Sequence, residues 1–149
     1  MITIKTNIDI VTDKILKKLN ILQDREYLLR PVAFDVVSLM TERIHQEGQA
    51  SDGNQIGQYS NNYLKQRVKK YNRKEDKKIV VSLTRQLEND WSVIATERGY
   101  GIGFLNTFNL QKAGWVEEIK DKSIFKLTKR EADYARDKLQ QLITDAIHS

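Results

Sequence analysis

The sequence contains no cysteine, a single proline and only two histidines among its 149 residues. Without cysteine the chain forms no disulfide, no thiolate metal site and no cysteine nucleophile. The histidines, His45 and His148, lie far apart and lack neighbouring ligands, which disfavours a histidine metal centre. No stretch approaches the roughly 18 apolar residues of a membrane span, and the start lacks an apolar leader. These absences predict a soluble intracellular protein without membrane contact, metal or cofactor.

Patterns typical of catalysis are also missing. The acidic pairs Glu75–Asp76 and Glu117–Glu118 are adjacent in sequence, and helix neighbours point about 100° apart, so adjacency makes no acid–base pair. No serine lies in a nucleophile elbow. Asp52–Gly53–Asn54 resembles the start of a calcium loop, but Tyr63 stands where that loop needs a glutamate. We therefore expect a protein that is not an enzyme.

Glycine is concentrated in the stretch RGYGIGF, where Gly99, Gly101 and Gly103 alternate with larger residues. This spacing matches neither the dinucleotide pattern G-x-G-x-x-G nor the P-loop pattern. A period of two places the three glycines on one face of a strand and Tyr100, Ile102 and Phe104 on the other. The glycines predict a bare strand face that another subunit can approach closely.

Positive charge is concentrated in one segment of this basic chain, whose net charge is +5. Only Glu75 and Asp76 oppose the basic residues there, and the rest of the chain is close to neutral. Such a cluster fits a polyanion, including duplex DNA, or an acidic protein surface, and it is equally typical of a solvated mobile loop. The eight basic residues are Lys65, Arg67, Lys69, Lys70, Arg73, Lys74, Lys77 and Lys78.

Hydrophobic spacing predicts the elements of a single domain over residues 1–149. A short strand at 2–5 precedes a helix over 6–20, capped by Thr6 or Asn7, and together they form an N-terminal extension over 1–23. An amphipathic helix follows, with apolar residues at Ala33, Val37, Met40 and Ile44, and it ends at Gly48. Pro31 either begins this helix or kinks a longer one.

The second half of the chain begins with a turn-rich, mobile loop or arm over 49–78, with a tight turn at Asp52–Gly53 and a short helix near 63–71. Residues 79–149 are predicted to hold strands around a brief helical turn, a hairpin of 91–96 with 99–104, and two helices. In the last helix Thr128 and Glu131 form a capping box. The fold class is α+β, with two to three amphipathic helices packed on a small antiparallel sheet.

Two blocks resemble the phage virion-morphogenesis family of tail-completion, or head–tail joining, proteins, the Mu protein G type. In RIHQEGQASDGNQIGQYSNNYLKQRVK the matching features are Ile44, Gly48, Asp52–Gly53, Ile56, Tyr59–Ser60 and Lys65. In IVVSLTRQLENDWSV they are Thr84, Leu87 and Asp90, with Arg85 standing where the family has a turn glycine. Phe125, Leu127 and Thr128 resemble the family's approach to its last helix.

The resemblance implies a non-enzymatic structural protein of a tailed phage or prophage, assembled into the virion in the bacterial cytoplasm. Such proteins form rings at the head–tail junction or tail end, and tail symmetry suggests six copies. Partners would be further copies, neighbouring connector and tail proteins, and duplex DNA passing through the ring. Within that expectation, the glycine strand packs subunits together and the basic arm faces DNA or an acidic neighbour. A small DNA-binding protein without sequence preference is the alternative.

Overall fold

The computed structural model describes residues 8–82, 84–97 and 99–148, so the predicted strand at 2–5 and the predicted helix cap at Thr6 or Asn7 lie outside the described part. The order of elements is α1 (Ile8–Gln23), α2 (Arg25–Thr41), a π-helical turn (Glu42–Gln46), α3 (Asn61–Tyr71), α4 (Gln86–Asp90), β1 (Trp91–Thr96), β2 (Gly99–Phe104), α5 (Thr107–Lys120) and α6 (Lys129–His148). Helices and a two-stranded antiparallel sheet confirm the α+β class. No helix in the described ranges is long and apolar enough to cross a membrane.

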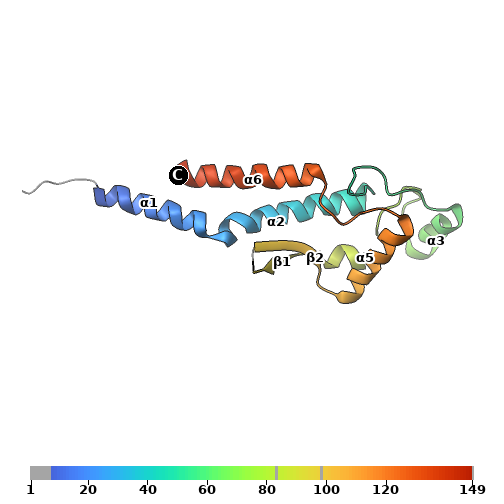
Figure 1. Ribbon diagram of the computed structural model, residues 1–149. Helices are drawn as coiled ribbons and strands as arrows, with labels where there is room; N and C mark the ends of the chain where they lie inside the picture. Colours follow the sequence, from blue (N-terminus) through green and yellow to red (C-terminus); the bar gives the residue numbers. More distant parts are fainter. Residues whose placement is uncertain (1–7, 83, 98, 149) are drawn as a thin grey trace, which may run out of the picture.

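The helix α2 is the central layer of an elongated molecule (Figure 1). The helix α6 packs on one side of it and the hairpin of β1 and β2 on the other, and α4 and α5 also contact the hairpin. The prediction that two to three helices pack on a small antiparallel sheet is confirmed, because α2, α4 and α5 contact its strands, while α6 packs on α2. α1 extends beyond this stack at one end, and α3 and α5 lie towards the other.

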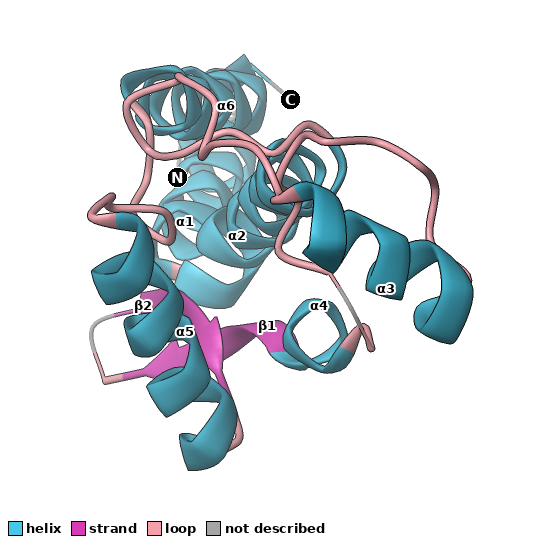
Figure 2. Cartoon of the chain, turned by 90° about the vertical axis from the view of Figure 1, so that its right-hand side faces the viewer, coloured by secondary structure: helices cyan, strands magenta, loops and turns pink. Residues whose placement is uncertain are grey.

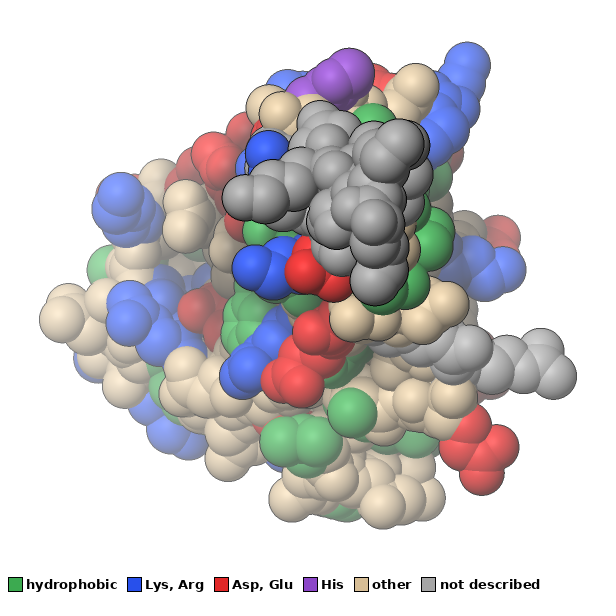
Figure 3. Space-filling view, turned by 90° about the vertical axis from the view of Figure 1, so that its left-hand side faces the viewer, with side chains coloured by type: hydrophobic (Ala, Val, Ile, Leu, Met, Phe, Trp, Pro, Cys, Tyr) green, Lys and Arg blue, Asp and Glu red, His purple; other side chains and the backbone are tan. Residues whose placement is uncertain are grey.

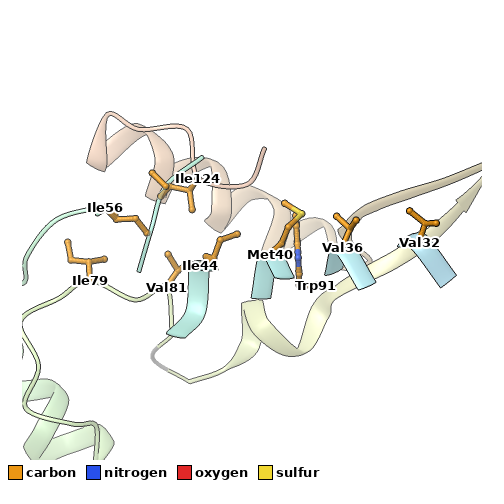
Figure 4. Close-up of a cluster of buried hydrophobic side chains, with 10 residues drawn as sticks. Val32, Val36, Met40, Ile44, Ile56, Ile79, Val81, Trp91 and Ile124 are labelled. Carbon is orange, nitrogen blue, oxygen red and sulfur yellow. The ribbon is translucent and has the colours of Figure 1, made fainter. Parts of the chain in front are cut away.

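The core is built around a row of buried side chains along α2. Val32, Val36, Met40 and Ile44 are buried at intervals of four residues, which places them in a row along the helix. Figure 4 shows this row, with Trp91 beside Met40 and with Ile56, Ile79, Val81 and Ile124 gathered near Ile44. The sequence predicted an apolar stripe of Ala33, Val37, Met40 and Ile44. Met40 and Ile44 are buried as predicted, but Ala33 and Val37 are only half-buried, and the buried positions before Met40 are Val32 and Val36. Because α2 is covered on two sides, its apolar surface is wider than one stripe.

Helix boundaries follow local capping. α1 continues past the predicted stop at Asn20, and Asp24 then begins α2 by accepting a hydrogen bond from the Tyr27 backbone N–H at 3.1 Å. Pro31 lies inside α2, so the longer helix is the correct alternative. The predicted hairpin pairs as expected, with Trp91 opposite Phe104 and Thr96 opposite Gly99. The strand expected after residue 78 is absent from the described part, where only the isolated bridge of Gln58 with Lys78 forms.

The π-helical turn after α2 buries three consecutive residues, Arg43, Ile44 and His45. Gly48 follows with φ +68°, the left-handed conformation expected of a glycine at a helix end. A Cβ atom at Gly48 would collide with the Ile79 carbonyl oxygen, so glycine is required there by space as well as by conformation. The predicted turn at Asp52–Gly53 also forms, with Gly53 at φ +83°.

A buried ion pair joins this turn to α6. Arg43 Nε donates to Glu131 Oε1 at 2.5 Å, and both side chains are almost fully buried. The remaining Arg43 nitrogens donate to the carbonyl oxygens of Gln49, Ile124 and Lys126. Glu131 also accepts from the Thr128 backbone N–H, while Thr128 Oγ1 accepts from the Glu131 N–H, which is the predicted capping box.

Replacing Glu131 with glutamine should destabilise the protein by about 3–5 kcal/mol, because it leaves the buried Arg43 guanidinium without its counter-charge. Urea unfolding followed by circular dichroism measures this loss. The matched control is Arg30→Ala, which breaks the exposed pair with Glu26 and should cost about 0–1 kcal/mol. Equal losses in the two variants would contradict the assigned role of Arg43.

Candidate functional site

The basic segment lies on α3 and the chain that follows it. Ser60 caps α3 by accepting from the Tyr63 backbone N–H at 3.3 Å, and Asn72 ends it in the left-handed conformation. The short helix predicted near 63–71 within the loop is therefore confirmed as α3. Five of the eight basic side chains are exposed, Arg73 and Lys78 are half-buried, and Arg67 is buried; the exposed ones are Lys65, Lys69, Lys70, Lys74 and Lys77.

The two ends of the basic segment are tied together. The Tyr59 N–H donates to the Lys77 carbonyl at 2.7 Å, and the Ile79 N–H donates to the Gly57 carbonyl at 3.0 Å. The Tyr59 hydroxyl donates to the Val80 carbonyl at 2.5 Å, and burial raises the pKa of this phenol. The segment therefore projects from a hydrogen-bonded base, with its exposed lysines on the projecting part.

Arg67 does not face outward with the other basic residues. Its Nη2 donates to the Ser82 carbonyl at 2.8 Å, and its guanidinium carbon lies 4.3 Å from the centre of the Tyr59 ring. Arg73 also contacts Ser82, through the hydroxyl. Arg67 is buried because α3 packs through the row of Leu64 and Arg67 against the chain at 79–82. It therefore takes no part in an exposed basic surface.

The glycine strand is β2, and its predicted faces agree with the register. Tyr100, Ile102 and Phe104 pair with residues of β1 that face α2, and Phe104 packs against Trp91 and Phe125. On the outer face, Cβ atoms at Gly101 and Gly103 would make only contacts of 3.3–4.0 Å, to Ile94 and Thr96. Gly99 differs, because its φ of +149° brings a Cβ within 3.1 Å of Leu29. The structure therefore leaves space for a side chain at Gly101, while the Ile94 side chain lies close to Gly103.

A partly exposed apolar surface runs along α1. Ile15, Leu16 and Leu19 are each about half exposed, although they are large and apolar. Figure 3 views the molecule from this end and shows hydrophobic side chains at the surface between charged ones. Large apolar side chains grouped at a surface mark a contact with another molecule. The sequence indicated an apolar side of this helix, and the structure shows that Ile15, Leu16 and Leu19 stay about half exposed beside the contacts that α1 makes with α2 and α6.

His45 is buried rather than exposed at a helix end. Its Nδ1 lies 2.6 Å from the Val81 carbonyl, which requires a proton on that nitrogen, and its Nε2 has no partner in the described ranges. Desolvation by burial lowers the pKa of His45 below its ordinary value of 6.5, despite the opposing effects of the Val81 carbonyl and Glu88. Burial therefore favours the neutral form of the His45 ring.

The described residues contain no cluster of three or more histidine and acidic side chains placed to hold a metal ion. Asp52 accepts a hydrogen bond from the Asn54 backbone N–H, which lowers the pKa of the Asp52 carboxyl and closes the local turn. The carboxyl of Glu117 accepts hydrogen bonds from the backbone N–H groups of Ile124 and Phe125. These acidic groups hold the chain in place.

Several of the residues that carry the family resemblance are buried in the core or hold neighbouring elements together. Ile44, Gly48 and Ile56 are buried, and Phe125 belongs to an aromatic cluster with Trp91. Arg85, where the family has a glycine, has φ +63° and precedes α4. Asp90 accepts hydrogen bonds from the Asn106 backbone and the Asn109 side chain, which lower the pKa of its carboxyl and tie the hairpin to α5.

Comparison of the chain with protein-family models, with curated proteins and with solved structures gives no match.

The protein should become less stable as the pH falls, because His45 is buried. The unfolded state binds a proton at His45 near pH 6.5, whereas His45 in the folded state stays neutral to lower pH. The free energy of unfolding therefore decreases as the pH falls below 6.5. Urea titrations between pH 8 and pH 5, at constant ionic strength, measure the loss. In His45→Gln the amide can still donate to Val81, and this variant should lose less stability over the same range. A parallel decline in both proteins would contradict the assignment.

Arg85→Gly should raise the free energy of unfolding by about 1 kcal/mol, because the left-handed backbone is strained for arginine and relaxed for glycine. Thermal and urea unfolding measure the gain. Asn72→Gly is the matched control, since Asn72 has a similar conformation that asparagine tolerates. A loss of stability in Arg85→Gly, or an equal gain in both variants, would show that the Arg85 backbone is not strained.

Proposed function

We propose that this chain is a non-enzymatic structural protein of a tailed phage or prophage, forming a ring at the head–tail junction. The observation that carries the proposal is the presence of two unlike surfaces that remain partly exposed in the described part of the chain. One is the apolar row of Ile15, Leu16 and Leu19 on α1, and the other is the outer face of the hairpin at Gly101 and Gly103. Each can accept the other from a second copy.

Unlike surfaces favour a closed ring over a dimer. When a subunit binds through two different patches, the contact repeats from copy to copy, and it ends only if the rotation closes the circle. A single self-complementary patch would instead stop at two copies. In the proposed contact, α1 of one copy lies across the hairpin of the next. Glycine at positions 101 and 103 permits the helix to approach the strand backbone closely.

The family resemblance supports the same conclusion. Arg85 adopts the backbone conformation that glycine favours, at the position where tail-completion proteins have their turn glycine. The exposed lysines of α3 and the following chain supply a charged surface for a neighbouring virion protein or for DNA in the ring.

Those lysines also favour the alternative of a small DNA-binding protein. Lys65, Lys69, Lys70, Lys74 and Lys77 are exposed on one projecting segment. Lysines that neutralise phosphates release counterions, so this function requires binding of DNA by the monomer with a steep dependence on salt. The ring proposal requires association of the protein with itself, with apolar contacts that resist salt.

Light scattering at low and high salt separates the two functions. The purified protein should have a mass several times the 17.4 kDa of one chain, and the mass should persist as salt rises. Leu16→Glu with Leu19→Glu should give folded monomers, and Gly101→Val should do the same because valine obstructs the approach of α1. Lys17→Glu, also exposed on α1, is the control and should leave the ring intact.

Circular dichroism and thermal unfolding establish that each variant is folded. A wild-type monomer at the highest attainable concentration would overturn the ring proposal. If that monomer also binds duplex DNA and releases it as salt rises, the alternative function replaces it.

A further inference from the structure

An open apolar groove of about 780 Å³ lies between α3, the chain at 79–82, α4 and α5. Figure 2 shows these helices around one end of the molecule, with α4 between α3 and α5. Its walls include Tyr63 from α3 and Trp115 and Ile119 from α5, whose exposed fractions are 38%, 52% and 77%. The volume is within the range of sites that enclose ligands, and large apolar side chains line it. This groove is separate from both surfaces of the proposed ring contact.

Arg67 lines the groove with a charge that is incompletely paired. The residue is 4% exposed, and its Nε has no hydrogen-bond partner among the described residues. No ion pair joins Arg67 to a carboxylate within the same ranges. Its guanidinium rests instead on the Tyr59 ring and one carbonyl. A buried charge without a counter-charge is unfavourable, and an anion brought into the groove would relieve that cost.

Other charges around the groove have the same sign. Arg85, Lys112 and Lys120 join Arg67 among the residues that line it, and no described lining residue is acidic. The Lys112 ammonium lies over the Phe108 ring and donates to the Gln86 side chain at 2.5 Å, so it is held at the edge of α5. The lining therefore combines apolar walls with cations, which complements a ligand with an apolar body and negative charge.

We propose that this groove docks an amphipathic peptide segment of a partner protein, with a carboxylate of that segment paired to Arg67. Tyr63, Trp115 and Ile119 receive its apolar side chains, and Arg85, Lys112 and Lys120 attract further acidic residues. Laying an apolar peptide face into a groove is a common mode of recognition. The α1 helix of a second copy is a poor match, because the lysines among its charged residues, Lys14, Lys17 and Lys18, outnumber Asp9 and Asp13. The inference does not depend on the ring.

Selection from a displayed library of random peptides, with the full-length protein as bait, tests the proposal. Enriched peptides should combine leucine or aromatic residues with aspartate or glutamate. Each synthesised peptide is then titrated against the protein by fluorescence anisotropy. Trp115→Glu and Ile119→Glu should abolish binding, and both side chains are exposed enough for the variants to fold. Leu110→Glu is the control, because Leu110 is 57% exposed on α5 and does not line the groove.

The role of Arg67 has its own readout. Replacing the acidic residues of a selected peptide with their amides should weaken binding about tenfold or more, the size expected for one charge-assisted hydrogen bond. Arg67→Met should remove this preference for the acidic peptide, and Arg67→Lys should restore part of it. If Arg67→Met lowers thermal stability but leaves the preference unchanged, Arg67 supports only the structure and the proposal is wrong.

Three other outcomes would also overturn the proposal that the groove docks a peptide. Enrichment of neutral or basic peptides, binding that survives Trp115→Glu, or a selection that enriches nothing would each do so. Dodecanoate is titrated in parallel, and if it binds in the groove while no peptide does, the site is for a small amphiphile and not for a protein. Light scattering of the groove variants distinguishes this failure from that of the ring, because their mass should equal that of the wild type.

Discussion

The buried pairing of Arg43 with Glu131 is the interaction on which the rest of the structure depends. One guanidinium holds the chain after α2, the stretch before α6 and the first turn of α6 through three carbonyls and a carboxylate. Glu131 is also the acidic member of the cap that begins α6. The position of α6 on α2 is therefore set by charge and hydrogen bonds at one end and by apolar packing along its length.

The π-helical turn makes this arrangement possible. Consecutive side chains at Arg43, Ile44 and His45 must reach α6, the core and the chain at Val81, which lie in different directions. The π-helical turn is wider than a regular helical turn. It places all three side chains in buried contacts, and the helix ends before Gly48. The same end of α2 therefore contacts the chain at the base of the basic segment and, through His45 and Val81, one wall of the groove.

Features set by neighbours in sequence were predictable. The hairpin, the Thr128–Glu131 cap and the turn at Gly53 depend on a few adjacent residues, and each has the predicted form. Features that depend on packing between distant parts of the chain could not be predicted. Nothing local distinguishes Arg67 from the lysines around it, and its burial follows only from where α3 lies. Similarly, the apolar residues of α1 and α5 have helical spacing, but only the fold shows which of them remain uncovered.

The contacts of Arg43 also set an order of events during synthesis. Its partners Ile124, Lys126 and Glu131 lie more than 80 residues further along the chain. When the hairpin has left the ribosome, the central helix is complete and the Gln49 carbonyl is already available to Arg43, but the acceptors at Ile124, Lys126 and Glu131 have not yet emerged. Apolar packing of α2 on the hairpin can therefore form before the buried ion pair, and the end of α2 gains its remaining bonds only when the last helix emerges.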